Sequence, residues 1–377
     1  MIFFFSLFMI IYIYMGYPIL VFLFSRTKNK RVKKGNHEPH VTILIAAYNE
    51  ENSIESTIKN KLDLDYPKEK LEIIVISDAS TDKTDDIVKK YEEQGVRLFR
   101  QEPRAGKTSA LNMAVPKAKS KILVFSDANS LYATDAMNKL VQSFSDPNVG
   151  YVTGKMIYTN PDGTTIGDGC TNYMKYENYL RRFETKIGSI VGVDGGIDAV
   201  RKELYQPMNP DQLPDFVLPL KVIEQGYRVV YEPEAVLKET SLKSSKDEYR
   251  MRVRVSLRSL WAMSDMRNLL TFKASKLFAW QLWSHKVLRY LCFIFLIGAY
   301  SSNLFIWPYG DFYKVFFVLQ NLAYLSAIVS SILEKCGYHS RLLSLLRYFA
   351  LLNVAAAHAF IKFLLGRKQV MWTPRKG

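Results

Sequence analysis

Two aspartates and a lysine stand where predicted β-strands end. Asp78 directly follows a β-branched stretch at residues 71–77, and Asp127 follows another at residues 121–125. Lys107 closes the polar turn after a third such stretch. If the strands are parallel, their carboxyl ends meet at one edge of the sheet, where open α/β sheets bind ligands. Carboxylates and an ammonium gathered there could hold a divalent cation and a phosphate-bearing ligand.

Asp127 begins a short Asp-Ala-Asn sequence that ends in Asn129. Carboxylate and amide oxygens suit Mg²⁺ or Mn²⁺, hard cations that bind diphosphate oxygens. Such an ion neutralises the charge that builds up on a departing nucleotide diphosphate. Asp215, just before a helix predicted for residues 218–225, is a candidate to deprotonate an acceptor hydroxyl. The alternative is that Asp215 caps this helix.

Two common nucleotide-binding motifs are missing from the sequence. The stretch at residues 104–108 lacks the first glycine of a GxxxxGK[ST] loop, and no GxGxxG follows the first predicted strand. The sequence therefore disfavours a P-loop ATPase and a nicotinamide-dependent dehydrogenase.

Strands and helices alternate through the first half of the central region, which predicts a doubly wound α/β sheet. The runs rich in Val, Ile and Leu are typical of buried parallel strands. We predict strands at residues 41–46, 71–77, 96–100 and 121–125, and helices at residues 54–62, 82–94, 107–118 and 218–225.

The net charge of +15 is concentrated beside apolar segments. Residues 25–40 hold six Lys or Arg against one Glu, and residues 270–377 hold thirteen against two acids. Residues 41–269 are nearly neutral, with 32 basic and 33 acidic side chains. This distribution is typical of a membrane protein, and we expect no nucleic-acid partner. A hydrophobic content of 48% excludes a disordered chain.

Three apolar segments are long enough to cross a bilayer: residues 2–24, 290–309 and 315–333. The first lacks the basic start of a signal peptide and is longer than its apolar part, so we expect a retained anchor. The basic stretch after it places the N-terminus outside and the chain from Arg26 onward in the cytoplasm. Residues 342–366 are interrupted by charges, and they either span the membrane or lie in its interface.

These patterns divide the chain into five parts. Trp and cations alternate before the second predicted span, which indicates an amphipathic helix in the membrane interface. We expect an N-terminal anchor (1–25), a basic cytoplasmic linker (26–40), a catalytic domain (41–245), amphipathic interface helices (246–288) and a C-terminal membrane region (289–377). The three cysteines are widely separated, which suits a reducing cytoplasm and predicts no disulfide framework.

Five short motifs occur in the order and spacing of a known family. They are Val41-Thr-Ile-Leu-Ile-Ala-Ala-Tyr-Asn-Glu-Glu51, Ile76-Ser-Asp-Ala-Ser-Thr-Asp82, Gly106-Lys107 with Leu111-Asn112, Phe125-Ser-Asp-Ala-Asn129, and Leu213-Pro-Asp215. Through them nearly the whole chain resembles a membrane-bound family 2 glycosyltransferase of the GT-A fold. This branch includes the cellulose, chitin, hyaluronan and poly-N-acetylglucosamine synthases.

The resemblance implies a role for each matching residue. Asp215 would be the general base, and Asp127 with Asn129 would hold the metal and diphosphate. Arg254 would clamp the diphosphate. Residues implied around the nucleotide sugar are Ala47, Tyr48 and Glu50 at the uridine, Asp78 at the uracil, Lys107 at the nucleotide or its phosphates, and Gly195 and Gly196 beside the sugars.

The sequence departs from the family pattern at a few positions. The family's Gln-x-x-Arg-Trp motif is Met251-Arg-Val-Arg254-Val255, so only its arginine is kept. Trp261, two helical turns further on, is a candidate replacement for the missing acceptor platform. Asn129 replaces the second Asp of the metal-binding pair, and only Asp215 survives of the Thr-Glu-Asp motif. Arg254 could alternatively belong to a cationic interface helix.

The resemblance implies a multi-pass enzyme of the cell membrane with a cytoplasmic catalytic domain. It would use Mg²⁺ or Mn²⁺ to transfer a sugar from a UDP-linked donor, with inversion, to a glycan or lipid-linked acceptor. Such transfer would serve extracellular polysaccharide synthesis. Two alternatives stay open: single-sugar transfer to a polyprenyl lipid, and a catalytically silent subunit that assembles with other chains into a synthase complex.

Overall fold

A mixed eight-stranded sheet organises the computed structural model, which describes residues 1–159, 164–240, 244–273, 275–336 and 340–370. Its strand order is β3-β2-β1-β4-β7-β6-β8-β5. The four predicted strands are confirmed and form its parallel half: β1 (Val41–Ala47), β2 (Leu71–Asp78), β3 (Val96–Gln101) and β4 (Ile122–Asp127). Every residue of β1 is buried, as expected for a central strand covered on both faces.

The other half of the sheet departs from a purely parallel arrangement. Its strands are β5 (Leu131–Tyr132), β6 (Val149–Thr159), β7 (Asp198–Arg201) and β8 (Arg228–Thr240). β7 runs antiparallel to both β4 and β6, whereas β6 and β8 are parallel. Inserting β7 beside β4 brings the loop before β7 next to the carboxyl end of β4.

Four of the helices beside the sheet lie where they were predicted, most of them with shifted ends, whereas α6 was not predicted. The helices beside the sheet are α3 (Ile54–Leu62), α4 (Thr84–Lys89), α5 (Lys107–Ala114), α6 (Ala136–Gln142) and α8 (Pro214–Glu224). α4 and α5 are shorter than predicted, because each passes into a 3₁₀ turn, at Glu92–Gln94 and Val115–Lys117. α8 begins four residues earlier than predicted, with Pro214 in its first turn, a position that suits proline.

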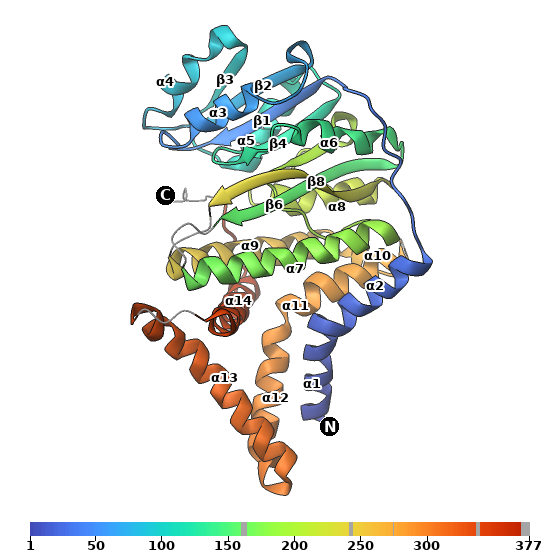
Figure 1. Ribbon diagram of the computed structural model, residues 1–377, viewed down its shortest axis with the longest axis vertical. Helices are drawn as coiled ribbons and strands as arrows, with labels where there is room; N and C mark the ends of the chain where they lie inside the picture. The colour runs from blue at the N-terminus through green and yellow to red at the C-terminus, as the bar shows by residue number, and fades with distance from the viewer. Residues whose placement is uncertain (160–163, 241–243, 274, 337–339, 371–377) are drawn as a thin grey trace.

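Two long helices separate the sheet from the apolar end of the molecule. α7 (Thr165–Ile187) and α9 (Ser245–Asp265) lie side by side below β6 and β8 in Figure 1. α2 (Tyr17–Thr27) and the short helices α10 (Lys276–Leu282) and α11 (Leu288–Tyr290) pack beneath them.

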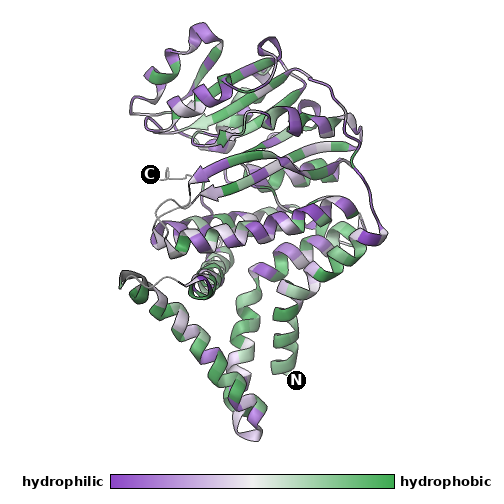
Figure 2. Ribbon diagram, viewed as in Figure 1, coloured by the Kyte–Doolittle hydropathy of each residue, from purple (hydrophilic) through white to green (hydrophobic). Residues whose placement is uncertain are grey.

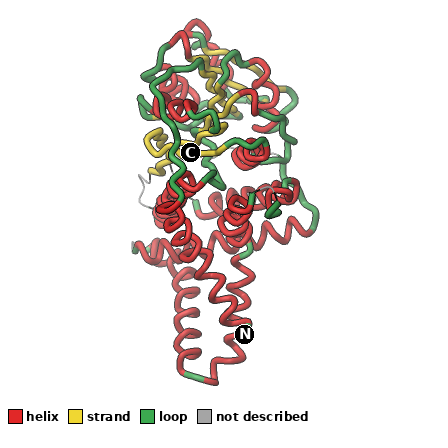
Figure 3. Tube along the Cα trace, turned by 90° about the vertical axis from the view of Figure 1, so that its right-hand side faces the viewer, coloured by secondary structure: helices red, strands yellow, loops and turns green. Residues whose placement is uncertain are grey.

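Apolar helices project from this layer. They are α1 (Ile2–Ile11), joined to α2 by a π-helical turn, and the hairpin of α12 (Cys292–Ile306) and α13 (Asp311–Lys335). Figure 2 shows hydrophobic residues concentrated in α1, α12 and α13, and Figure 3 shows them extending together away from the catalytic domain. Within the described residues four helices are long and apolar enough to cross a membrane: Ile2–Thr27, Cys292–Tyr309, Asp311–Ser330 and Arg341–Leu364.

The last of these, α14 (Arg341–Leu364), lies differently from the others. Figure 1 views it almost end-on, whereas α12 and α13 are seen from the side. Its side chains contact α9 along its length: the Tyr348 hydroxyl donates to Glu248 at 2.7 Å, and the Phe363 ring packs against Trp261. Beyond its end, Lys368 pairs with Asp211 at 2.5 Å. α14 therefore packs along α9, and the segment after it contacts the loop that leads into α8.

A buried polar network joins the apolar helices to α7. His285 lies between two glutamates of α7, with Nδ1 2.7 Å from Glu184 and Nε2 3.1 Å from Glu177. Tyr17 of α2 donates to Glu184, and Arg289 of α11 pairs with Glu177. These polar contacts tie α2, α11 and the turn between α10 and α11 to one helix.

Candidate active site

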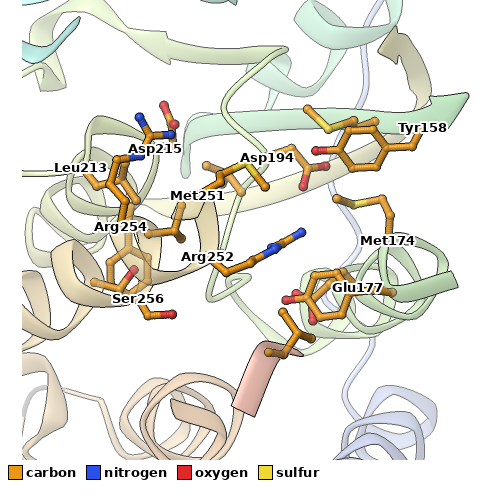
Figure 4. Close-up of a pocket in the computed structure, with 18 of the residues that line it drawn as sticks. Tyr158, Met174, Glu177, Asp194, Leu213, Asp215, Met251, Arg252, Arg254 and Ser256 are labelled. Atoms are coloured by element: carbon orange, nitrogen blue, oxygen red, sulfur yellow. The ribbon is translucent and has the colours of Figure 1, made fainter. Parts of the chain in front are cut away.

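A cavity of about 730 Å³ lies between the carboxyl edge of the sheet and helices α7, α9 and α14. It is lined by Glu50, Lys107, Asp127, Asn129, Asp215 and Arg254, six of the residues singled out in the sequence. Figure 4 shows Asp215 and Arg254 together on one side of this pocket, with Arg252 and Glu177 toward the other. The cavity therefore gathers side chains from strand ends, loops and α9.

Lys107 joins the two aspartates at the sheet edge. Its Nζ lies 2.8 Å from Asp127 Oδ1 and 3.4 Å from Asp215 Oδ1. Burial opposes the charge of the ammonium, but the carboxylates of Asp127 and Asp215 outweigh it and raise the pKa of Lys107. Asp127 stands at the last residue of β4 and Lys107 at the first of α5, so the sheet itself sets this arrangement.

Asp215 occupies the first turn of α8 without capping it. The residue at the N-cap position is Leu213, so the alternative of Asp215 as the cap is wrong. Gly195, with φ +85°, allows the close approach of this carboxylate: a Cβ built on Gly195 would lie 2.4 Å from Asp215 Cγ. Burial raises the pKa of Asp215 while Lys107 lowers it and Asp127 raises it further, and the net shift is upward. A carboxyl with a raised pKa beside a cavity is suited to proton transfer.

The arginines of α9 have distinct surroundings. Arg254 lines the cavity, and burial lowers its pKa against the opposing charges of Asp215 and Asp127. Arg252 donates to Glu248 at 2.8 Å and to the Tyr348 hydroxyl at 2.6 Å. The position of both side chains inside the protein argues against a helix that merely presents cations to the membrane.

Arg258 was not assigned a site role from the sequence. Its side chain is 6% exposed and donates to the carbonyl oxygens of Asp211, at 3.0 Å, and Pro210, at 3.2 Å. Burial lowers its pKa to about 10, with the charge of Arg254 acting in the same direction. Arg258 thus fixes the loop that leads into α8 and Asp215. Its spacing of four residues from Arg254, one helical turn, is the signal that could have identified it.

The residues expected around the nucleotide base lie in different environments. Glu50 lines the cavity and accepts a 2.6 Å hydrogen bond from Ser53. Tyr48 lies under Arg104, whose guanidinium carbon is 3.4 Å from the ring centroid. The Ala47 side chain is buried in the core instead, and Ala46 lines the cavity in its place, because successive side chains of a strand point to opposite faces of the sheet.

Asp78 supports the loop that leads to Lys107. Its carboxylate accepts hydrogen bonds from the Gln101 amide at 2.6 Å and from the backbone N–H groups of Ala105, at 2.8 Å, and Gly106, at 2.9 Å. Its side chain is 2% exposed. This position places Asp78 beneath the loop rather than on the cavity wall.

Gly196 and Trp261 both pack away from the acceptor region. The Gly196 carbonyl accepts from the Tyr132 hydroxyl at 2.9 Å, and a Cβ on this glycine would overlap Leu237 at 2.8 Å. Trp261 packs against Phe363, and its indole N–H donates to a carbonyl in the segment after α14. The structure therefore does not bring Trp261 to the cavity as a substitute platform.

The donor set fits a divalent cation that is shared with a ligand. Asp127 and Asn129 both line the cavity and offer carboxylate and amide oxygens, which Mg²⁺ and Mn²⁺ accept. Among the residues that the structure describes, no group of three or more His, Cys, Asp or Glu could hold a metal. An ion at these two residues would complete its coordination with water and with diphosphate oxygens.

Comparison with known proteins identifies this arrangement. Residues 42–206 match the family described as Glycosyl transferase family 2. The chain is 31% identical over 203 residues to a poly-β-1,6-N-acetyl-D-glucosamine synthase of Staphylococcus aureus, covering 52% of this chain and 48% of that one. It is 29% identical over 251 residues to the probable glycosyltransferase YdaM of Bacillus subtilis, covering 63% and 57%. The chain thus aligns with about half the length of these relatives.

A solved structure matches the fold over nearly the full chain. It is a mannosyltransferase from Pyrobaculum calidifontis, in complex with GDP-Man and Mn²⁺, with a TM-score of 0.73 at 22% identity. The match covers 97% of this chain and 100% of the other. Residues 42–206 therefore match a family 2 glycosyltransferase domain, the chain has the GT-A fold, and apolar helices lie on both sides of this domain in the sequence.

Proposed function

We propose that the protein is a membrane-embedded inverting glycosyltransferase that takes its sugar from a UDP-linked donor. The observation that carries this proposal is the contact of Lys107 with both Asp127 and Asp215 on the wall of one cavity. Such a cluster can bind a diphosphate, balance its charge and accept a proton within a few ångströms.

In the proposed reaction, Asp215 accepts the proton of the acceptor hydroxyl as its oxygen attacks the anomeric carbon of the donor sugar. The bond from that carbon to the diphosphate breaks with inversion. Lys107 and Arg254 bind the departing diphosphate and stabilise its charge. Asp127 and Asn129 would hold Mg²⁺ or Mn²⁺, which supplies further positive charge to the diphosphate.

The loops that follow β1 and β2 would receive the nucleotide. We propose that Tyr48 and Glu50 contact the uridine, that Ala47 contributes only backbone, and that Asp78 orients the loop against which the uracil binds. Gly195 would let the carboxylate of Asp215 lie against the backbone beside the sugars, whereas Gly196 packs in the core. The poly-N-acetylglucosamine synthase relative supports a glycan-forming role, and the mannosyltransferase complex supports Mn²⁺ and makes a guanosine donor the competitor to test.

We propose a cytoplasmic catalytic domain anchored by three spans. The basic linker after α2 favours this side, and the N-terminus lies at the same end of the molecule as the tip of the α12–α13 hairpin in Figure 1. α14 would lie in the membrane interface, because it packs along α9 and the segment after it contacts the loop that leads into α8. The cationic residues Arg367 and Lys368 would then stay cytoplasmic; Arg375 and Lys376 lie outside the described residues.

The test is transfer or hydrolysis of nucleotide sugars by the purified full chain in neutral detergent with Mn²⁺. Asp215→Asn should lower kcat by about 10²- to 10⁴-fold, the usual contribution of a general base. Asp63→Asn, at an exposed position after α3, is the matched control and should behave as wild type. Near-wild-type transfer by Asp215→Asn would refute the base assignment. Any turnover by the wild-type chain alone excludes a catalytically silent subunit.

Addition of a single sugar to a lipid is the second candidate. Two observations favour it: Met251 and Val255 line the cavity where the family has Gln and Trp, and α14 lies across its membrane side. Product length separates the two candidates, since a ladder of oligomers indicates a processive polymerase and a single product indicates one addition.

A further inference from the structure

The cavity has a second polar end, remote in sequence from the aspartates. Four cationic side chains line it, and three are paired: Arg181 with Asp194 at 2.5 Å, Arg252 with Glu248 at 2.8 Å, and Arg289 with Glu177. The fourth, Lys286, makes no hydrogen bond or ion pair within the described part of the chain. The neighbouring carboxylates are already bound to arginines, and Glu184 is bound to Tyr17 and His285.

The backbone leaves room for the Lys286 ammonium. A Cβ built on Gly192 would lie 2.6 Å from Lys286 Nζ, so a larger residue at this point of the cavity wall would displace the ammonium. Lys286 is partly buried, and its ammonium carries three N–H donors for which no acceptor lies within reach among the described residues. A ligand that offers anionic oxygens beside Gly192 would satisfy them.

One wall of the same cavity is apolar and belongs to α14. Leu345, Leu346, Phe349 and Leu352 line the cavity there. Leu345 is also 53% exposed, so this apolar wall continues to the protein surface at the first turns of α14. α13, which precedes this end of α14 in the chain, carries the candidate membrane span Asp311–Ser330. A ligand that complements both Lys286 and this apolar wall has an anionic group and a long hydrocarbon chain.

We propose that the acceptor is a membrane lipid that carries its sugar on a phosphate group, with the phosphate at Lys286 and the hydrocarbon chain along α14. This inference rests on the proposed function and names its acceptor. The paired Arg289, whose guanidinium lies 5.3 Å from the Tyr176 ring, adds positive charge to the same region. The sugar occupies the space between Lys286 and Asp215, which places one of its hydroxyls at the base.

The transfer balances without any further reactant. The hydroxyl oxygen of the lipid-borne sugar forms the new bond to the anomeric carbon of the donor. The bond from that carbon to the nucleoside diphosphate breaks, and its electron pair leaves with the diphosphate oxygen. The hydroxyl proton passes to Asp215. The lipid phosphate is only bound and takes no part in bond making.

The probe is farnesyl phosphate, titrated calorimetrically into the full chain in neutral detergent. Wild type should bind it at least tenfold more tightly than either farnesol or inorganic phosphate, because the site binds both the phosphate charge and the hydrocarbon chain of the ligand. Lys286→Met should weaken binding by about ten- to a hundredfold, the loss expected for one hydrogen bond to a charged group. Gly192→Ala, which displaces the ammonium, should weaken it in the same direction. Lys276→Met, at an exposed lysine of α10, should match wild type. Thermal unfolding checks that each variant is folded.

Each contrary result would refute a specific part of the lipid-phosphate proposal. Equal binding by Lys286→Met and Lys276→Met refutes the site, and equal binding of farnesol refutes the phosphate. Equal binding of inorganic phosphate refutes the lipid chain. A neutral N-acetylglucosamine disaccharide that binds in a Lys286-dependent way, when farnesyl phosphate does not, replaces the lipid by a glycan. Titration of UDP with Mn²⁺ into the same sample tests the proposed function separately, since a chain that binds UDP can still fail the lipid test.

Discussion

Gly195→Ala probes the base at Asp215 without touching its carboxyl group. Gly195 has φ +85°, and an added Cβ would lie 2.4 Å from both Cγ and Oδ2 of Asp215. Ordinary contacts of this kind are 3.4 Å or longer. The carboxylate must therefore move by about 1 Å, a displacement that can cost about a hundredfold in rate.

The same substitution also carries a backbone cost. An alanine in the left-handed region is less stable than glycine by about 1 to 2 kcal/mol. Gly226→Ala is the matched control, because Gly226 has φ +87° with no heavy atom within 4 Å of the added Cβ. Both variants should lose similar stability, whereas only Gly195→Ala should lose activity.

The assay is kcat for nucleotide-sugar turnover, with the melting temperature measured on the same preparations. We expect kcat of Gly195→Ala to fall about a hundredfold relative to Gly226→Ala, with KM for the donor little changed. If the two variants differ in kcat by less than twofold, the close packing of Gly195 against Asp215 has no role in catalysis and the reasoning fails.

Three further predictions concern charge. Burial raises the pKa of Asp198 to about 7, above its ordinary value of 3.8, so this carboxyl stabilises the fold below pH 4 and loses that contribution as pH rises to about 7. Wild type should therefore lose about 3 kcal/mol of stability through this group between pH 5 and pH 8, and Asp198→Asn should remove that loss, as measured from unfolding at the two pH values; an unchanged pH dependence would contradict the buried charge. Lys107→Met removes the ammonium that lowers the pKa of Asp215, so the acidic limb of the pH–rate profile should move to higher pH, and a limb that does not move would separate Lys107 from the base. Asn129→Asp adds charge to the metal ligands and should reduce severalfold the Mn²⁺ concentration for half-maximal activity after chelation, whereas no change would place the metal away from Asn129.

The parallel half of the fold follows from local sequence. Continuous β-branched runs such as residues 41–46 predict buried strands, and all four predicted strands are present within one or two residues. The rest depends on distant contacts. β7 has only four residues and gains its place by pairing with β4 and β6, and α7 lies in a stretch for which no helix was predicted. Short strands of this kind carry too little pattern to be recognised alone.

The site was predictable as a set of chemical groups but not as contacts. Asp127, Lys107 and Asp215 were named from their positions after strands and in motifs, and they share one cavity. The sequence could not show that Asp215 packs on Gly195, that Ala47 turns into the core, or that Lys286 reaches the same cavity. Each of these depends on how segments about 20 to 180 residues apart meet, which only tertiary packing decides.

The polar network around His285 makes the apolar helix α2 part of the folding unit of the domain that carries α7. Glu177 and Glu184 are 2% and 0% exposed, and their partners come from α2, α11 and the turn before α11. A buried carboxylate deprived of its partner destabilises a protein by about 3 to 5 kcal/mol. A chain shortened to begin at residue 41 would lose Tyr17 and leave Glu184 with one partner fewer. Packing of α2 against α7 and folding of the domain that carries α7 are therefore thermodynamically linked.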